Sequence, residues 1–271
     1  MGNPKRIAYF VSDSTGITAE VYGRSLLSQF GDIQFDTLYR PHINTIEKAK
    51  RLAAHVNEQA ELRDDLPMIF STMADKQINE CLEQTNSHYY ELFDQFMPAL
   101  IEATGLTPVR RSGRVHSIQQ PESYDARIDT INYAMTNDDG THMENYANAD
   151  VILVGVSRSG KTPTCLYLAL HFNLRAANYP ITDDDFEKGC LPDVILDHKD
   201  KVFALTIDPQ RLANIRERRR PLSRYAELKN CHRELALAND FYERYGFRVY
   251  DSTTHSIEEL TSLIVTKLQD N

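Results

Sequence analysis

Short runs of apolar residues alternate along the chain with longer segments in which apolar residues recur every three or four positions. The short runs predict buried β-strands, and the longer segments predict amphipathic α-helices. Because the two kinds alternate, the pattern is typical of an α/β fold with mainly parallel sheets covered by helices. The predicted strands are Ile7–Val11, Gln34–Tyr39, Met68–Ser71, Val151–Val156, Val202–Ile207 and Phe247–Tyr250.

The segments of helical period fall into two groups, and no internal repeat or low-complexity tract is visible between them. The first group consists of Ile17–Phe30, Thr45–Ala60, Asp75–Gln84 and Tyr89–Thr104. The second group consists of Tyr124–Asn137, Thr162–Asn173, Gln210–Arg219, Arg224–Tyr245 and Ser256–Leu268.

A stretch without any apolar period, Leu106–Gln120, separates the two groups. It is rich in Pro, Gly, Ser and Arg, which is typical of a boundary. The pattern therefore predicts an N-terminal α/β domain over residues 1–105, a connecting segment over residues 106–140, and a second domain over residues 141–271. Because this second domain contains the phosphate-binding loop motif Gly155–Thr162, we expect it to be a P-loop nucleotide-binding domain.

Eight consecutive residues in the second half match the phosphate-binding pattern G-x-x-x-x-G-K-[ST], with a predicted strand before them and a predicted helix after them. Glycines let backbone N–H groups approach phosphate oxygens, and the helix N-terminus adds partial positive charge. The lysine is expected to contact the outer phosphates and the threonine to offer its hydroxyl to Mg²⁺. A flexible surface turn is the alternative. The eight residues are Gly155, Val156, Ser157, Arg158, Ser159, Gly160, Lys161 and Thr162.

This loop and several other blocks resemble the bacterial phosphoenolpyruvate synthase regulatory proteins, relatives of the plant pyruvate, phosphate dikinase regulatory proteins. The resemblance covers nearly the whole chain and is more specific in the C-terminal half. The matching blocks are Gly155–Thr164, Arg175–Pro180, Ser12–Gly16, Tyr124–Ile128, Asp138–Gly140, Thr206–Pro209, Leu212–Arg219 and Ser223–Tyr225.

The resemblance implies a bifunctional enzyme. It would phosphorylate a threonine of phosphoenolpyruvate synthase with ADP as donor, and it would remove that phosphate with inorganic phosphate, releasing pyrophosphate. Mg²⁺ is the expected metal. Lys161 and the loop amides would stabilise the transferred β-phosphoryl group, while the acceptor hydroxyl occupies the space of a γ-phosphate. Two alternatives stay open: an ordinary P-loop kinase of a small molecule, and a nucleotide-sensing module without turnover.

The threonine hydroxyl needs a proton acceptor, and Asp138-Asp139-Gly140 offers one. Turn chemistry alone also explains this tripeptide. The family pattern makes one of the two carboxylates a candidate general base, and Asp139 is preferred. His116 and His142 are the other candidates.

Arginines gather towards the C-terminal end of the predicted helix Gln210–Arg219, where the helix dipole favours cations. Guanidinium groups are also the usual phosphate clamps, so Arg216 is a candidate catalytic residue. Asp208 either holds Mg²⁺ together with Thr162 or caps the helix that begins at Pro209. The cluster comprises Arg211, Arg216, Arg218, Arg219 and Arg220.

The sequence allows two interpretations for each of two further segments. Ser12–Gly16 follows the first predicted strand and is either a second anion site or a helix cap made by Ser14 or Thr15. Asp183–Asp185 is either a metal site or a solvated loop.

The composition of the chain argues against several classes of binding partner and location. The net charge of −9 over 271 residues argues against nucleic-acid binding, because phosphate backbones repel a net anion. The 4 cysteines form no zinc pattern. No apolar run reaches the length of a membrane span or of a signal peptide. We expect a cytoplasmic protein that contacts neither nucleic acid nor membrane, and a homodimer is left open.

Overall fold

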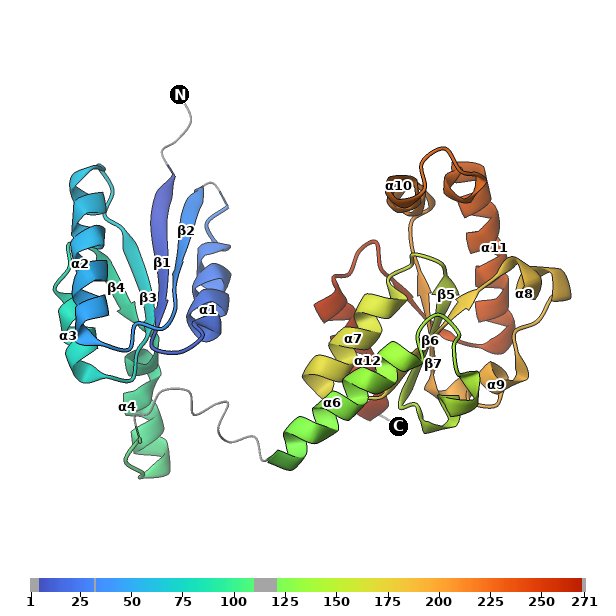
Figure 1. The fold of residues 1–271 in the computed structure, drawn as a ribbon, viewed down its shortest axis with the longest axis horizontal. Coiled ribbons are helices and arrows are strands. Elements are labelled where there is room, and N and C mark those ends of the chain that lie inside the picture. The colour runs from blue at the N-terminus through green and yellow to red at the C-terminus, as the bar shows by residue number, and fades with distance from the viewer. Residues whose placement is uncertain (1–4, 32, 110–120, 270–271) are drawn as a thin grey trace. The chain divides into compact units, whose positions relative to one another are not determined.

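The computed structural model describes residues 5–31, 33–109 and 121–269. By its internal contacts the chain divides into two compact units, Met1–Gln119 and Gln120–Asn271. Each unit contains a four-stranded parallel sheet with helices on both faces, as Figure 1 shows. The predicted α/β fold with parallel sheets is therefore confirmed.

The sheet of the first unit has the strand order β2-β1-β3-β4. Alternate residues of β1 point to opposite faces, because successive side chains of a strand do so. Ile7, Tyr9 and Val11 join the core under α2 and α3, whereas Ala8 and Phe10 join the core under α1. The elements are β1 (Arg6–Ser12), α1 (Ile17–Leu27), β2 (Phe35–Arg40), α2 (Ile46–Glu61), β3 (Met68–Thr72), α3 (Lys76–Glu83), β4 (His88–Glu91) and α4 (Leu92–Thr104).

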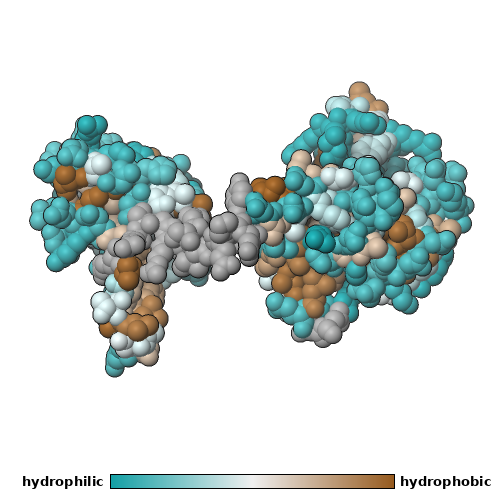
Figure 2. Space-filling view, turned by 60° about the horizontal axis from the view of Figure 1, so that its bottom comes forward, coloured by the Kyte–Doolittle hydropathy of each residue, from teal (hydrophilic) through white to brown (hydrophobic). Residues whose placement is uncertain are grey.

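Helix α4 keeps much of its apolar surface in solvent. Phe93, Phe96, Leu100 and Ile101 are all exposed. Figure 2 shows hydrophobic surface along this helix, while hydrophilic residues cover most of the visible face of the second unit.

The sheet of the second unit has the strand order β6-β5-β7-β8. Ile152 and Val154 of β5 join the core beneath α11, and Val151 and Leu153 join the core beneath α7 and α12. The main elements are α6 (Pro121–Thr136), β5 (Val151–Val156), α7 (Lys161–Phe172), β6 (Ala176–Ile181), α8 (Asp183–Lys188), α9 (Asp193–Leu196), β7 (Val202–Thr206), α10 (Pro209–Arg219), α11 (Leu228–Tyr245), β8 (Arg248–Asp251) and α12 (Ile257–Gln269). Three 3₁₀ turns join them: η1 (Met143–Asn148), η2 (Lys199–Lys201) and η3 (Arg224–Ala226).

Helix α6 lies within the stretch that the sequence assigns to a connection. Its residues Ile131 and Ala134 pack with Cys165 and Leu168 of α7. This helix therefore forms part of the core of the second unit.

Two strands were not predicted from the sequence. The segment His88–Glu91 pairs in parallel with β3, so the helix expected from Tyr89 begins only at Leu92. Ala176–Ile181 pairs in parallel with β5 as strand β6, although Asn178 and Pro180 interrupt its apolar pattern. The predicted helix Arg224–Tyr245 was also too long, because it consists of the turn η3 followed by α11.

Candidate active site

The loop that joins β5 to α7 lies at a branch point of the second sheet. Strand β6 adds to one side of β5 and strand β7 to the other. Parallel α/β sheets bind ligands at such points, beyond the carboxyl ends of their strands. The strand predicted before this loop and the helix predicted after it are both confirmed.

The backbone of the loop depends on two glycines. A Cβ atom at Gly155 would lie 2.7 Å from the carbonyl oxygen of Leu205 and 2.7 Å from Oγ of Ser159. Gly160 has φ 97°, a left-handed conformation that other residues adopt only with strain. Arg158 has φ 76° and carries such strain itself. A larger residue would therefore clash at Gly155 and strain the backbone at Gly160.

The loop has the donors that an anion needs. Helix α7 begins at Lys161, so the N–H groups of Lys161 and Thr162 have no acceptor within the helix. Oγ of Ser159 is buried and finds no hydrogen-bond partner among the described groups. The two N–H groups stand at the N-terminal end of α7, where a helix favours an anion such as a phosphate group.

Lys161 is only 4 % exposed, and its Nζ donates a hydrogen bond of 3.1 Å to the carbonyl oxygen of Val156. Burial lowers the pKa of Lys161 to about 8, and the negative charge of Asp139 opposes that shift. In the described parts of the chain, no carboxylate lies within ion-pair distance of this ammonium group. A bound anion would therefore supply the missing countercharge.

A second group of contacts fixes the turn after α6. The hydroxyl of Thr162 donates to Oδ1 of Asp138 at 2.8 Å, and the side-chain amide of Asn178 donates to the same oxygen. Asn178 also accepts from the backbone N–H groups of Asp139 at 3.2 Å and Gly140 at 2.9 Å. Asn178 thus aims the Asp138 carboxylate at the start of α7.

Asn178 was not singled out as functional from the sequence, although it lies in a block that carries the resemblance. It is fully buried in strand β6. A polar residue in the middle of a buried strand is the signal that identifies it, but that signal requires the strand to be recognised first.

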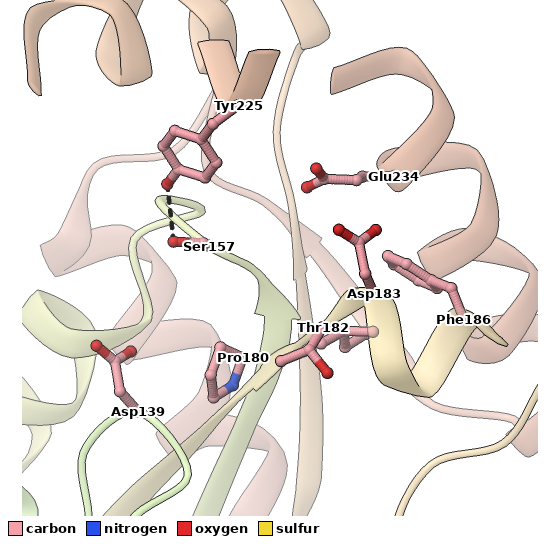
Figure 3. Close-up of a pocket in the computed structure, with 9 residues that line it drawn as sticks. Asp139, Ser157, Pro180, Thr182, Asp183, Phe186, Tyr225 and Glu234 are labelled. Atoms are coloured by element: carbon pink, nitrogen blue, oxygen red, sulfur yellow. Dashed lines mark hydrogen bonds between the residues drawn. The ribbon is translucent and has the colours of Figure 1, made fainter. Parts of the chain in front are cut away.

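Asp139, the preferred base, lies beside the loop. It adopts φ 51°, and its side chain lines a cavity of about 320 Å³ that Ser157 also lines. Figure 3 shows the Asp139 carboxylate near the lower end of the loop that carries Ser157. Among the described residues, none forms a hydrogen bond with this carboxylate. Its position is compatible with proton transfer in that cavity.

Of the two histidines considered as alternative bases, the structure describes only His142. The ring of His142 is exposed and interacts with Glu144 at 3.1 Å, so it is engaged outside the loop. His116 lies outside the described residues.

Arg216 is fully buried, and its guanidinium contacts the backbone of the loop at Ser157. Its Nη2 donates to the carbonyl oxygen of Ser157 at 3.0 Å and to Glu234 at 2.7 Å. Its Nη1 donates to the carbonyl oxygen of Tyr225 at 3.1 Å. The guanidinium also lies 4.1 Å from the centre of the Tyr225 ring. The hydroxyls of Tyr225 and Ser157 interact at 2.8 Å (Figure 3). Because these protein groups already occupy its donors, Arg216 is suited to position the loop rather than to contact a phosphate itself.

The other arginines of the cluster lie on the surface. Arg218, Arg219 and Arg220 are exposed, and Arg211 donates to the carbonyl oxygen of Thr253 at 2.6 Å. Glu234, which neutralises Arg216, was not anticipated from the sequence. It lies 18 residues further along the chain, on a different helix.

Asp208 caps helix α10, since its Oδ1 accepts from the backbone N–H of Arg211 at 2.8 Å. This is the alternative interpretation given for that residue. The structure brings Asp138 to Thr162 instead.

The Asp183–Asp185 segment is neither a loop nor a cluster of metal ligands. It forms the first turn of α8, where Asp185 accepts from the hydroxyls of Tyr179 and Thr182. Asp183 forms an ion pair of 2.7 Å with Arg233. Within the described ranges, no group of three or more His, Cys, Asp and Glu side chains is arranged to hold a metal ion.

The segment after β1 differs from the cap predicted there. Gly16, in a left-handed conformation, precedes α1, and no side chain caps this helix. Capping by Ser14 or Thr15 was therefore wrong. The carboxylate of Asp13 accepts a hydrogen bond of 2.8 Å from the backbone N–H of Ala74.

Fold and site together define a parallel α/β protein with a glycine-containing loop, a buried lysine and a carboxylate at the branch point of its second sheet. The chain belongs to the kinase/pyrophosphorylase family, whose model matches residues 8–265. It is 50% identical over 264 residues to a protein of Thiocapsa roseopersicina, covering 97% of each chain. It is 44% identical over 261 residues to a protein of Stutzerimonas stutzeri, covering 96% of each chain. Both relatives are provisionally named phosphoenolpyruvate synthase regulatory protein.

In the part of the chain that the structure describes, no helix combines the length and the apolar character needed to cross a membrane.

Proposed function

We propose that this protein regulates phosphoenolpyruvate synthase by ADP-dependent phosphorylation of a threonine and by phosphate-dependent removal of that phosphate. The observation that carries the proposal is the buried, carboxylate-free ammonium of Lys161 within the loop Gly155–Thr162. Membership of the kinase/pyrophosphorylase family and the names of the relatives support it. We expect the protein to act in the cytoplasm, where a metabolic enzyme such as the synthase would be found.

In the forward direction the threonine oxygen attacks the β-phosphorus of ADP. The bond from that phosphorus to the bridging oxygen breaks, and AMP leaves. The proton of the threonine hydroxyl passes to the Asp139 carboxylate. Lys161 and the loop N–H groups stabilise the charge on the transferred phosphoryl group.

In the reverse direction an oxygen of inorganic phosphate attacks the phosphorus of phosphothreonine. The bond to the threonine oxygen breaks, the oxygen takes up a proton from Asp139, and pyrophosphate leaves. The phosphoryl group passes the same cation in both directions, so one loop serves both activities.

Mg²⁺ fits the pair formed by the Thr162 hydroxyl and the Asp138 carboxylate, because Mg²⁺ prefers oxygen ligands and uses few from the protein. We assign the metal to this pair rather than to Thr162 and Asp208. When bound, the ion would neutralise phosphate charge. Arg216 is proposed as a positioning residue for Ser157, since its own donors are occupied.

The test is a reaction of the purified protein with phosphoenolpyruvate synthase and either ADP or ATP, followed by mass spectrometry of the synthase. We expect phosphothreonine and AMP with ADP, and pyrophosphate when phosphate is then added. Efficient transfer from ATP in the absence of ADP would favour an ordinary kinase. Nucleotide binding without any transfer would favour a sensing module.

A further inference from the structure

Two cavities flank the loop Gly155–Thr162 along the carboxyl edge of the second sheet. The first, of about 320 Å³, lies beyond β6 and is lined by Pro180, Ile181 and Thr182. The second, of about 390 Å³, is lined by Ile207 after β7 and by Ser252 after β8. Because β5 stands between β6 and β7 in the sheet, the cavities approach the loop from opposite sides.

The β6-side cavity is acidic. Asp139, Asp183 and Glu234 line it, and no Lys, Arg or His is among its described lining residues. Asp183 and Glu234 are each paired with an arginine, so the Asp139 carboxylate provides most of the uncompensated charge. Figure 3 shows the carboxylates of Asp183 and Glu234 on the side of the cavity away from Asp139. Such a wall disfavours a nucleotide, whose phosphates carry two or more negative charges.

The β7-side cavity has the opposite character. Arg158 and Arg211 line it, together with His255, and Glu258 is the acidic residue in its lining. Ile215 and Ile257 add apolar surface, which suits the flat face of a nucleobase. The cavity also reaches Ser159 and Gly160, so a nucleoside there is continuous with the phosphate donors of the loop.

We propose that the β7-side cavity binds the nucleoside of the donor, and that the β6-side cavity binds the hydroxyl-bearing segment of the protein acceptor. This inference rests on the proposed function. The donor phosphate then reaches the loop from one side and the acceptor oxygen from the other, as an in-line displacement requires. The proposed base Asp139 lies in the acceptor cavity, where the proton is released.

Two exposed acidic residues, one in each cavity, allow a matched test in the full-length protein. A photo-crosslinking benzoylphenylalanine is placed at Asp183 in one variant and at Glu258 in the other. With phosphoenolpyruvate synthase present, we expect crosslinks from position 183, mapped by mass spectrometry to the segment around the modified threonine. We expect none from position 258. In the unsubstituted protein, 8-azido-ADP should label residues 252–260.

Kinetics provide a second measurement. Arg211→Gln should raise the KM for ADP about tenfold, the scale of one lost charge-assisted hydrogen bond, and leave the KM for the synthase unchanged. Arg218 lies on the same helix, is exposed and lines neither cavity. Arg218→Gln should therefore change neither constant.

Several results would overturn the assignment while leaving the proposed function intact. These are synthase crosslinks from position 258, azido labelling confined to Thr182–Phe186, or phosphorylation of the synthase without a crosslink from position 183. A properly folded protein that neither phosphorylates nor crosslinks to the synthase would reject the proposed function, and the inference with it.

Discussion

The hydroxyl of Thr162 lies 2.8 Å from Oδ1 of Asp138, so the first turn of α7 is joined to the turn that follows α6. The two residues are 24 positions apart, with strand β5 between them. This contact places a carboxylate beside the loop, although Asp138 lies outside the eight residues of the loop pattern.

Replacing Asp138 with Asn tests that carboxylate. The change keeps the shape but removes the charge that a divalent cation needs, so half-saturation by Mg²⁺ should require about 10–100-fold more metal. A Mg²⁺ titration of ADP-dependent transfer measures this. Asp208→Asn is the matched control and should leave the titration unchanged. Equal Mg²⁺ dependence of Asp138→Asn and the unsubstituted protein would remove Asp138 from the metal site.

Lys161→Met should abolish both activities, because one cation serves the phosphoryl group in both directions. We expect a loss of at least about 10²-fold, the scale of one main electrostatic donor. The temperature midpoint of unfolding should be unchanged or higher, since a buried charge is replaced by an apolar side chain. Circular dichroism follows the unfolding. Phosphorolysis that survives this substitution would place the reverse reaction elsewhere.

The depressed pKa of Lys161 predicts proton uptake on binding. Burial lowers the pKa to about 8 in the folded protein, below its ordinary value of roughly 10.4. A bound phosphate favours the charged form and raises the pKa again. Between pH 8 and 9, ADP should therefore bind more weakly as pH rises, and each binding event should take up part of a proton.

Titration calorimetry in two buffers of different ionisation enthalpy measures that uptake. Lys161→Met is the control and should show none. Heats of ADP binding that are the same in both buffers at pH 8.5 would mean that Lys161 keeps its proton without ligand. The same pKa also predicts a stability trend. The unfolded chain binds more protons between pH 8 and 10.4, so the contribution of Lys161 to stability should rise with pH there.

Asp139→Asn should depress both directions by roughly 10²–10⁴-fold, the range for a positioned acid or base, and leave ADP affinity within a few-fold. Single-turnover assays with synthase and phosphosynthase measure the two directions. Near-normal rates would reduce Asp139 to a turn residue. Lost ADP binding would assign it to the nucleotide site.

Arg216→Met should destabilise the protein by about 3–5 kcal/mol, because Glu234 is left charged and buried without its partner. Urea unfolding measures the change. The double variant Arg216→Met, Glu234→Met should recover most of that stability without recovering activity, since Ser157 would still lack its support. Full activity in the double variant would show that the loop holds its shape without Arg216.

Much of the loop could be predicted from the sequence because its determinants are local. Gly155, Gly160 and Lys161 act through the backbone and charge of eight consecutive residues. Asn178 and Glu234 could not be predicted in this way. Each contacts the site only because β6 adds to one side of β5 and α11 packs across the sheet, and these arrangements depend on contacts between distant residues.

The same limit explains the missed strands. Tyr89 and Tyr90 lie just before the apolar segment of helix α4, so the sequence alone extends that helix back to Tyr89, whereas pairing with β3 makes His88–Glu91 a strand. In Ala176–Ile181, the amide of Asn178 interrupts the apolar run that would identify a buried strand. The same polar side chain that contacts Asp138 therefore hides the strand from the sequence pattern.

The shared strand order of the two sheets, β2-β1-β3-β4 and β6-β5-β7-β8, makes β1 and β5 equivalent members of one architectural plan. Strand β1 ends with a serine, Ser12, and strand β5 is directly followed by one, Ser157. In each unit a left-handed glycine precedes the next helix, Gly16 in one and Gly160 in the other. Between the serine and the glycine stands Asp13 in the first unit and Arg158 in the second. The two sheets thus share a strand order and a glycine before the helix that follows the central strand, while the residue after the serine is acidic in the first unit and basic in the second, so corresponding connections carry side chains of opposite charge.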